Sequence, residues 1–173
     1  YILPFYYSHS TELSANIFGF SKEDISFLSE TLYLNILENL NDKQDKIDIY
    51  CIWDENKKDN LPDALKGSSY NIIFSDASKK KLILDRLSSK EFLSYKNNLI
   101  IFSDATDIKP SDYEQYFNLL NIADESLVIG KNKENSIAVF GFNNYSEEII
   151  RNLLLSNFSY TDFLSRVKSC EHF

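Results

Sequence analysis

The stretch Leu99-Ile100-Ile101-Phe102 is apolar without interruption, and it ends abruptly in the polar stretch Ser103-Asp104-Ala105-Thr106-Asp107. Strands that carry helices on both faces are typically continuous apolar runs, because neither face meets water. The stretch therefore predicts a central, fully covered strand that ends in a polar loop.

Segments on both sides of this strand alternate between the periodicities of strands and helices. Strand patterns cover residues 1–7, 47–53, 70–74, 126–129 and 137–142, and helix patterns cover residues 21–40, 80–96, 111–120, 147–155 and 160–169. Capping boxes are predicted where Ser21 precedes Asp24 and where Ser111 precedes Glu114. Alternating strands and helices form a mainly parallel sheet with helices on both faces. We expect a three-layer α/β fold in a single domain over residues 1–173.

Composition and charge argue against several classes of protein. The 173 residues include 18 Lys and Arg against 26 Asp and Glu, which gives a formal net charge of −8. The longest basic run is Lys79-Lys80-Lys81. Binding to a polyanion depends on clustered basic side chains, so we expect no nucleic-acid partner. The chain has 4 glycines, where an average composition predicts about a dozen, so glycine-rich phosphate loops are excluded.

Two further features bear on the cellular compartment. No run approaches the ~20 apolar residues of a membrane span, so we expect no membrane-spanning segment. Cys51 and Cys170 lack the spacing of a zinc site or of a disulfide framework. We therefore expect a reduced, cytoplasmic setting.

The predicted strands place several polar loops at one edge of the sheet. The loops after Tyr7, Trp53, Phe74 and Phe102 share the edge at which α/β folds bind ligands. Two carboxylates, Asp104 and Asp107, follow Phe102 closely in sequence. Carboxylates at this spacing can hold Mg²⁺ or Mn²⁺, which prefer oxygen ligands. The alternative is that they bond their own backbone and cap the next turn.

Asp76, after the strand at residues 70–74, is a further candidate for the cofactor site on the same argument of position. We give it a lower weight than Asp104.

Two motifs then carry a family resemblance. The first is Phe102-Ser103-Asp104-Ala105-Thr106-Asp107-Ile108, and the second is Val128-Ile129-Gly130-Lys131 followed, after two residues, by Glu134-Asn135-Ser136-Ile137. They resemble the motifs Gly-Ser/Thr-Asp-x-Pro-x-Leu and Val-Leu-Gly-Pro-x-x-Asp-Gly-Gly-Tyr of small bacterial glycosyltransferase-A-like proteins. These proteins are related to nucleotide-diphosphosugar transferases and are often described only as a domain of unknown function.

The resemblance extends to both ends of the chain. Ser10-Thr11-Glu12-Leu13 stands where members of the family have Lys-Thr-Arg-Leu, and Ser159-Tyr160-Thr161 resembles a late Ser-Thr-Pro motif. It implies a Rossmann-like glycosyltransferase-A fold that binds a nucleotide or nucleotide-sugar. It places Ser10 and Thr11 at the nucleotide.

The same resemblance implies a division of chemical roles. Asp104 and Asp107 would hold Mg²⁺ or Mn²⁺ at the donor diphosphate, and Glu134 would position or deprotonate an acceptor hydroxyl.

Departures from the family pattern lie at the implied site. Ser10 and Glu12 replace two cations that could neutralise a diphosphate, and Asn135-Ser136 replaces Gly-Gly. The second exchange costs energy if either position requires a positive φ. These departures predict impaired or altered chemistry and leave open whether the chain is an enzyme.

Two functions follow, a metal-dependent glycosyltransferase and a non-catalytic module on the same fold that binds or assembles with a protein partner. A nucleotidyltransferase fits less well, because residues 8–13 contain neither a glycine-rich loop nor a basic residue beyond histidine.

Overall fold

The computed structural model describes residues 2–5, 20–40, 47–66, 70–102, 105 and 108–169. Their strands form one sheet in the order β3-β2-β1-β4-β6-β5. The strands are β1 (Ile2–Phe5), β2 (Tyr50–Asp54), β3 (Asn71–Ser75), β4 (Asn98–Phe102), β5 (Leu127–Lys131) and β6 (Ile137–Phe142). Neighbours among β3, β2, β1 and β4 are parallel, whereas β6 is antiparallel to both β4 and β5. The sheet is therefore mixed, with β6 running against the other strands.

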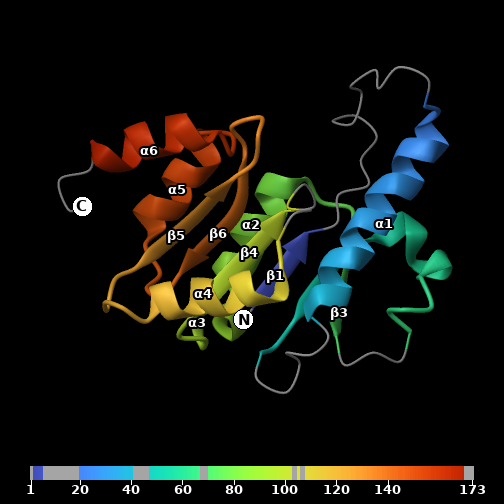
Figure 1. Ribbon diagram of the computed structural model, residues 1–173, viewed down its shortest axis with the longest axis horizontal. Helices are drawn as coiled ribbons and strands as arrows, with labels where there is room; N and C mark the ends of the chain where they lie inside the picture. The colour runs from blue at the N-terminus through green and yellow to red at the C-terminus, as the bar shows by residue number, and fades with distance from the viewer. Residues whose placement is uncertain are drawn as a thin grey trace.

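Helices cover both faces of this sheet, as the sequence predicts (Figure 1). The helices of the described residues are α1 (Lys22–Leu40), η2 (Glu55–Asn60), α2 (Lys79–Leu87), α3 (Lys90–Leu93), α4 (Pro110–Leu120), α5 (Glu147–Leu155) and α6 (Tyr160–Lys168). One apolar core joins α1 and α4 to the sheet, and a second core joins α2, α3, α5 and α6 to the opposite face. None of the helices in the described ranges is long and apolar enough to cross a membrane.

The central strand β4 belongs to both cores. All five of its residues are buried. Leu99 and Ile101 pack in the core of α1 and α4, and Ile100 and Phe102 pack in the core of the other four helices. Successive side chains of a strand point to opposite faces, so covering both faces buries apolar residues at successive positions, here Leu99 to Phe102. This confirms the prediction from the apolar run.

The starts of α1 and α4 test the two predicted capping boxes. The capping box at α1 is confirmed, because the backbone N–H of Ser21 donates to Asp24 Oδ2 at 2.9 Å and the backbone N–H of Asp24 donates to Ser21 Oγ at 3.1 Å. The capping box predicted at Ser111 is wrong. Pro110 already lies inside α4, and Asp112 Oδ2 accepts the backbone N–H of Lys109 at 2.8 Å instead.

The single helix predicted over residues 80–96 is in fact two helices, α2 and α3. Ser88 ends α2, and its hydroxyl donates to the carbonyl of Leu84 at 2.8 Å. Ser89 then caps α3, because its Oγ accepts the backbone N–H of Phe92 at 3.2 Å. Serine hydroxyls compete with the helical hydrogen bonds of the backbone, which explains the break.

Candidate functional site

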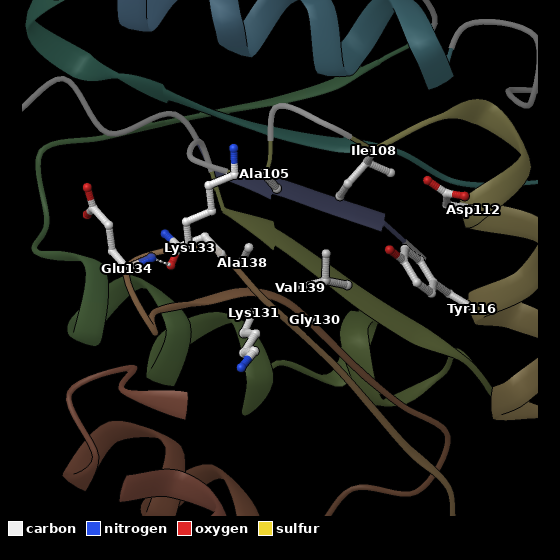
Figure 2. Close-up of a pocket in the computed structure, with 11 residues that line it drawn as sticks. Ala105, Ile108, Asp112, Tyr116, Gly130, Lys131, Lys133, Glu134, Ala138 and Val139 are labelled. Atoms are coloured by element: carbon white, nitrogen blue, oxygen red, sulfur yellow. Dashed lines mark hydrogen bonds between the residues drawn. The ribbon is translucent and has the colours of Figure 1, made fainter. Parts of the chain in front are cut away.

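A groove of about 840 Å³ lies where three parts of the chain meet (Figure 2). These parts are the segment that follows β4, the first turns of α4, and the hairpin that joins β5 to β6. Its apolar lining comes from Ala105, Ile108, Ala138 and Val139, and its polar lining includes side chains of α4 and of the hairpin turn. The groove thus lies on the face of the sheet that α1 and α4 cover.

A β-bulge shapes the floor of the groove. Gly130 pairs with Val139 while Lys131 pairs with Ile137, so β6 has one extra residue, Ala138. The bulge interrupts the alternation of side chains, and Ala138 and Val139 both line the groove and both pack in the same core. Gly130 permits this arrangement, because a Cβ added there would lie 3.1 Å from Val139 Cβ.

The hairpin turn holds Glu134 at one end of the groove. Asn132 Oδ1 accepts the backbone N–H of Glu134 at 3.0 Å and that of Ser136 at 2.8 Å. The backbone N–H of Asn132 also donates to the carbonyl of Ser136 at 2.9 Å. Figure 2 draws the bond to the backbone N–H of Glu134 as a dashed line, and the exposed carboxylate of Glu134 extends beyond it. The turn is therefore fixed by its own asparagine, while the carboxylate stays free to meet a ligand.

Asn135 has a left-handed backbone, with a φ of 66°. Its Nδ2 donates to Thr161 Oγ1 at 2.9 Å, and its carbonyl accepts the backbone N–H of Tyr160 at 2.8 Å. One of the two positions of the family's Gly-Gly pair, position 135, thus does have a positive φ in this chain. Asparagine is among the few residues that tolerate this conformation, and here it also ties the turn to the start of α6.

The opposite end of the groove belongs to α4, where Asp112 and Tyr116 lie one turn apart (Figure 2). Burial raises the pKa of the Tyr116 hydroxyl, and the Asp112 carboxylate raises it further, so the hydroxyl remains a hydrogen-bond donor. The sequence analysis missed both residues as site residues, because the helix pattern over residues 111–120 does not show which side chains will face the hairpin. The available signal was an aspartate in the first turn of the helix that follows the Asp104 loop.

Of the predicted site residues, Glu134 lines the groove. Asp104, Asp107, Ser10 and Thr11 lie outside the described residues.

Ala105, between the two aspartates in sequence, is buried and lines the groove. Its backbone N–H donates to the carbonyl of Phe102 at 2.9 Å. Among the described residues no group of three or more His, Cys, Asp or Glu side chains could hold a metal ion.

Asp76 is exposed directly after β3 and does not line the groove. Two strands, β2 and β1, separate β3 from β4, which amounts to about 14 Å across the sheet. Asp76 therefore shares an edge of the sheet with the loop after β4 but lies away from the groove.

Two large side chains near the site leave the groove open. Phe102, where the resemblance expects glycine, packs in the core of the other sheet face, with its ring centroid 5.4 Å from that of Phe158. Ile137 belongs to the same core. Lys79 Nζ lies 4.0 Å from the centroid of the Phe102 ring. The exchange of glycine for phenylalanine therefore does not block the groove.

No protein-family model matches the chain, and no curated protein matches its sequence. Among solved structures, it is similar to a "putative nucleotide-diphospho-sugar transferase" from Desulfovibrio desulfuricans G20, with a TM-score of 0.69. The match covers 96% of this chain and 74% of that chain at 13% sequence identity. At this identity the likeness establishes a shared fold over nearly the whole chain.

Proposed function

We propose that residues 1–173 form a glycosyltransferase-A-like domain that binds a nucleotide-diphosphosugar and whose chemistry is impaired or altered. The observation that carries this proposal is the fold shared with the Desulfovibrio protein over 96% of the chain. The order β3-β2-β1-β4 of parallel strands supports a Rossmann-like core, because it matches the first four positions in the strand order 3-2-1-4-5-6 of dinucleotide-binding folds. The motif resemblance supports the interpretation of this chain as a divergent member of the family of small bacterial glycosyltransferase-A-like proteins.

The groove suits the sugar part of such a ligand. Its apolar floor can contact the CH groups of a sugar ring, and the carboxylates of Asp112 and Glu134 can accept hydrogen bonds from hydroxyls. The protonated Tyr116 hydroxyl can donate one. In the catalytic version of the proposal, Glu134 accepts the proton of the attacking acceptor hydroxyl or orients that hydroxyl.

A divalent metal is a separate element of the proposal. The described residues do not supply a cluster of three ligands, so a metal site depends on Asp104 and Asp107. Ala105, which lies between these two residues in sequence, lines the groove, and this observation supports the proposal. Mg²⁺ or Mn²⁺ would neutralise a donor diphosphate there.

Binding is tested by calorimetric titration of a panel of UDP-, GDP- and CDP-sugars in the presence of Mn²⁺. Saturable heat with at least one donor supports the proposal, and no heat with any donor overturns it. If Asp104 holds the metal, Asp104→Asn abolishes the dependence on Mn²⁺. Asp85→Asn is the matched control, because Asp85 is an exposed carboxylate on α2, away from the groove.

Catalysis is tested with the donor that binds. Release of the nucleoside diphosphate should fall roughly 100-fold or more in Glu134→Gln, with a smaller change in donor affinity. Glu148→Gln is the matched control, because it makes the same exchange at the start of α5, outside the groove. It should leave the rate unchanged. Equal rates in both variants would remove Glu134 from the mechanism.

A non-catalytic module is the second candidate, and the hairpin favours it. Asn135 takes the place of an expected glycine and is tied to α6, which turns a site loop into a fixed structural turn. This candidate predicts that Asp104→Ala leaves both the cellular phenotype and the capture of partner proteins unchanged. Loss of the phenotype in a stably folded variant contradicts it.

A further inference from the structure

The strand β5 ends the sheet on one side. Within the described part of the chain, β5 pairs with β6 and with no strand on its other edge (Figure 1). A free edge presents unpaired backbone N–H and C=O groups and can pair with another strand. The side chains of β5 show which partner this edge fits.

Alternate residues of β5 and of the segment before it share the sheet face that carries α5 and α6. Leu127 and Ile129 are partly buried against the core of that face. Lys131 is exposed, and its Nζ lies 5.3 Å from the centroid of the Tyr160 ring in α6. Glu125 is exposed and lines a small pocket together with the first turn of α5. Along the edge this face therefore presents an acid, two apolar residues and a base.

We propose that β5 pairs antiparallel with β5 of a second copy of this chain, about a two-fold axis at Val128. In that register Leu127 faces Ile129 of the partner, and Glu125 faces Lys131 of the partner. Each contact occurs twice, as a two-fold interface requires. The sequence of this face is thus complementary to itself, with apolar pairs in the middle and opposite charges at both ends.

The other face of β5 is compatible with this register. Val128 faces its own copy, and Ser126 faces Gly130 of the partner, so only small or β-branched side chains meet there. An axis at Ile129 instead would set Lys131 against Leu127 of the partner and remove the pairing of opposite charges. The self-complementarity therefore selects the axis at Val128.

The opposite edge of the sheet lacks these features. The edge strand β3 contains Asn71, Ile73 and Ser75 on one face and Ile72 and Phe74 on the other, with no charged residue. It is also flanked by η2, from which Lys58 places its Nζ 5.2 Å from the centroid of the Phe74 ring. Charge complementarity is thus specific to β5.

The proposed dimer does not depend on the proposed function. One pair of short strands buries less than the ~1,200 Å² of a stable interface, so we expect a weak, concentration-dependent dimer. Sedimentation equilibrium from micromolar concentrations to about 1 mM measures it. A chain that stays monomeric over this range overturns the proposal.

Charge reversal identifies the interface. Glu125→Lys and Lys131→Glu each set like charges opposite one another at both ends of the strand pair. Each should weaken dimerisation about tenfold or more, and the double variant should restore it. Both positions are exposed, and circular dichroism checks that the variants fold. If the single reversals leave the affinity of dimerisation unchanged, or if the double variant does not restore it, the proposal is overturned.

A cysteine cross-link tests the register in the full chain carrying Cys170→Ser. Opposite residues of an antiparallel pair have Cα atoms about 4.5–5.5 Å apart, within the range of a disulfide. Val128→Cys should therefore form a disulfide-linked dimer under mild oxidation, whereas Ile129→Cys should not. Cys51 does not interfere, because its side chain is fully buried. Cross-linking through position 129 alone, or through neither position, contradicts the register.

Discussion

Asn135 offers a direct test of the backbone strain in the hairpin turn. At most positions alanine gives a more stable protein than glycine, because glycine loses more conformational entropy on folding. At a φ of 66° the order should reverse, because a side chain other than that of asparagine or aspartate is strained in the left-handed region.

The magnitudes follow from two contributions. Either substitution removes the hydrogen bond from Asn135 Nδ2 to Thr161 Oγ1 at 2.9 Å, which contributes about 1 kcal/mol. Asn135→Ala also adds strain of about 1 kcal/mol, for a total loss of about 2 kcal/mol in the free energy of unfolding. Asn135→Gly removes the strain, but glycine has more conformational entropy in the unfolded state, and these two effects offset each other. The lost hydrogen bond then leaves a net loss of about 1 kcal/mol in the free energy of unfolding.

Urea denaturation followed by circular dichroism measures these differences, with equal m-values as the check on two-state unfolding. Position 136 is the control, because Ser136 is not among the described residues with positive φ. There Ser136→Ala should be the more stable of the Ala and Gly variants. If Asn135→Ala is as stable as Asn135→Gly, the assignment of strain to this turn is refuted.

Three further predictions concern stability. Gly141→Ala should cost about 1–3 kcal/mol in thermal unfolding, because the new Cβ would lie 2.8 Å from a leucine Cδ1 atom in β4. Tyr113→Phe should raise the free energy of unfolding in urea by about 1 kcal/mol, because the buried Tyr113 hydroxyl has no hydrogen-bond partner among the described residues. Hydrogen bonds from the backbone N–H and the hydroxyl of Ser21 lower the pKa of Asp24. The wild type should therefore be more stable than Asp24→Asn, and the difference in the free energy of unfolding should be complete above the unfolded pKa of about 3.9. This difference should fade as the pH falls through the folded pKa. Equal stability of wild type and Asp24→Asn at neutral pH contradicts the last prediction.

The strands of the sheet were predictable because their signals are local. The apolar run at β4 and the bounds of β6 and α5 follow from residue patterns alone, and the structure places them as expected. The break between α2 and α3 was not predictable from periodicity. It depends on two serine hydroxyls that bond to the backbone, and an apolar stripe does not reveal this competition.

The groove was predictable only in part. Glu134 could be found because it occupies a fixed place in a motif, but Asp112 and Tyr116 become site residues only through the packing of α4 beside the hairpin. The bulge that turns both Ala138 and Val139 toward the groove likewise depends on the pairing of β5 with β6. A bulge arises from the way two strands pair, and the residue pattern of either strand alone does not reveal it.

The β5–β6 hairpin connects the two proposals made for this chain. Lys131 lines the groove and, in the proposed dimer, faces the partner's Glu125. A ligand that draws Lys131 into the groove would compete with that ion pair, whereas a ligand that leaves Lys131 at the edge would not. Because such coupling is reciprocal, any factor by which dimerisation changes ligand affinity is also the factor by which the ligand changes dimerisation. The hairpin is thus the element through which assembly and binding would influence each other.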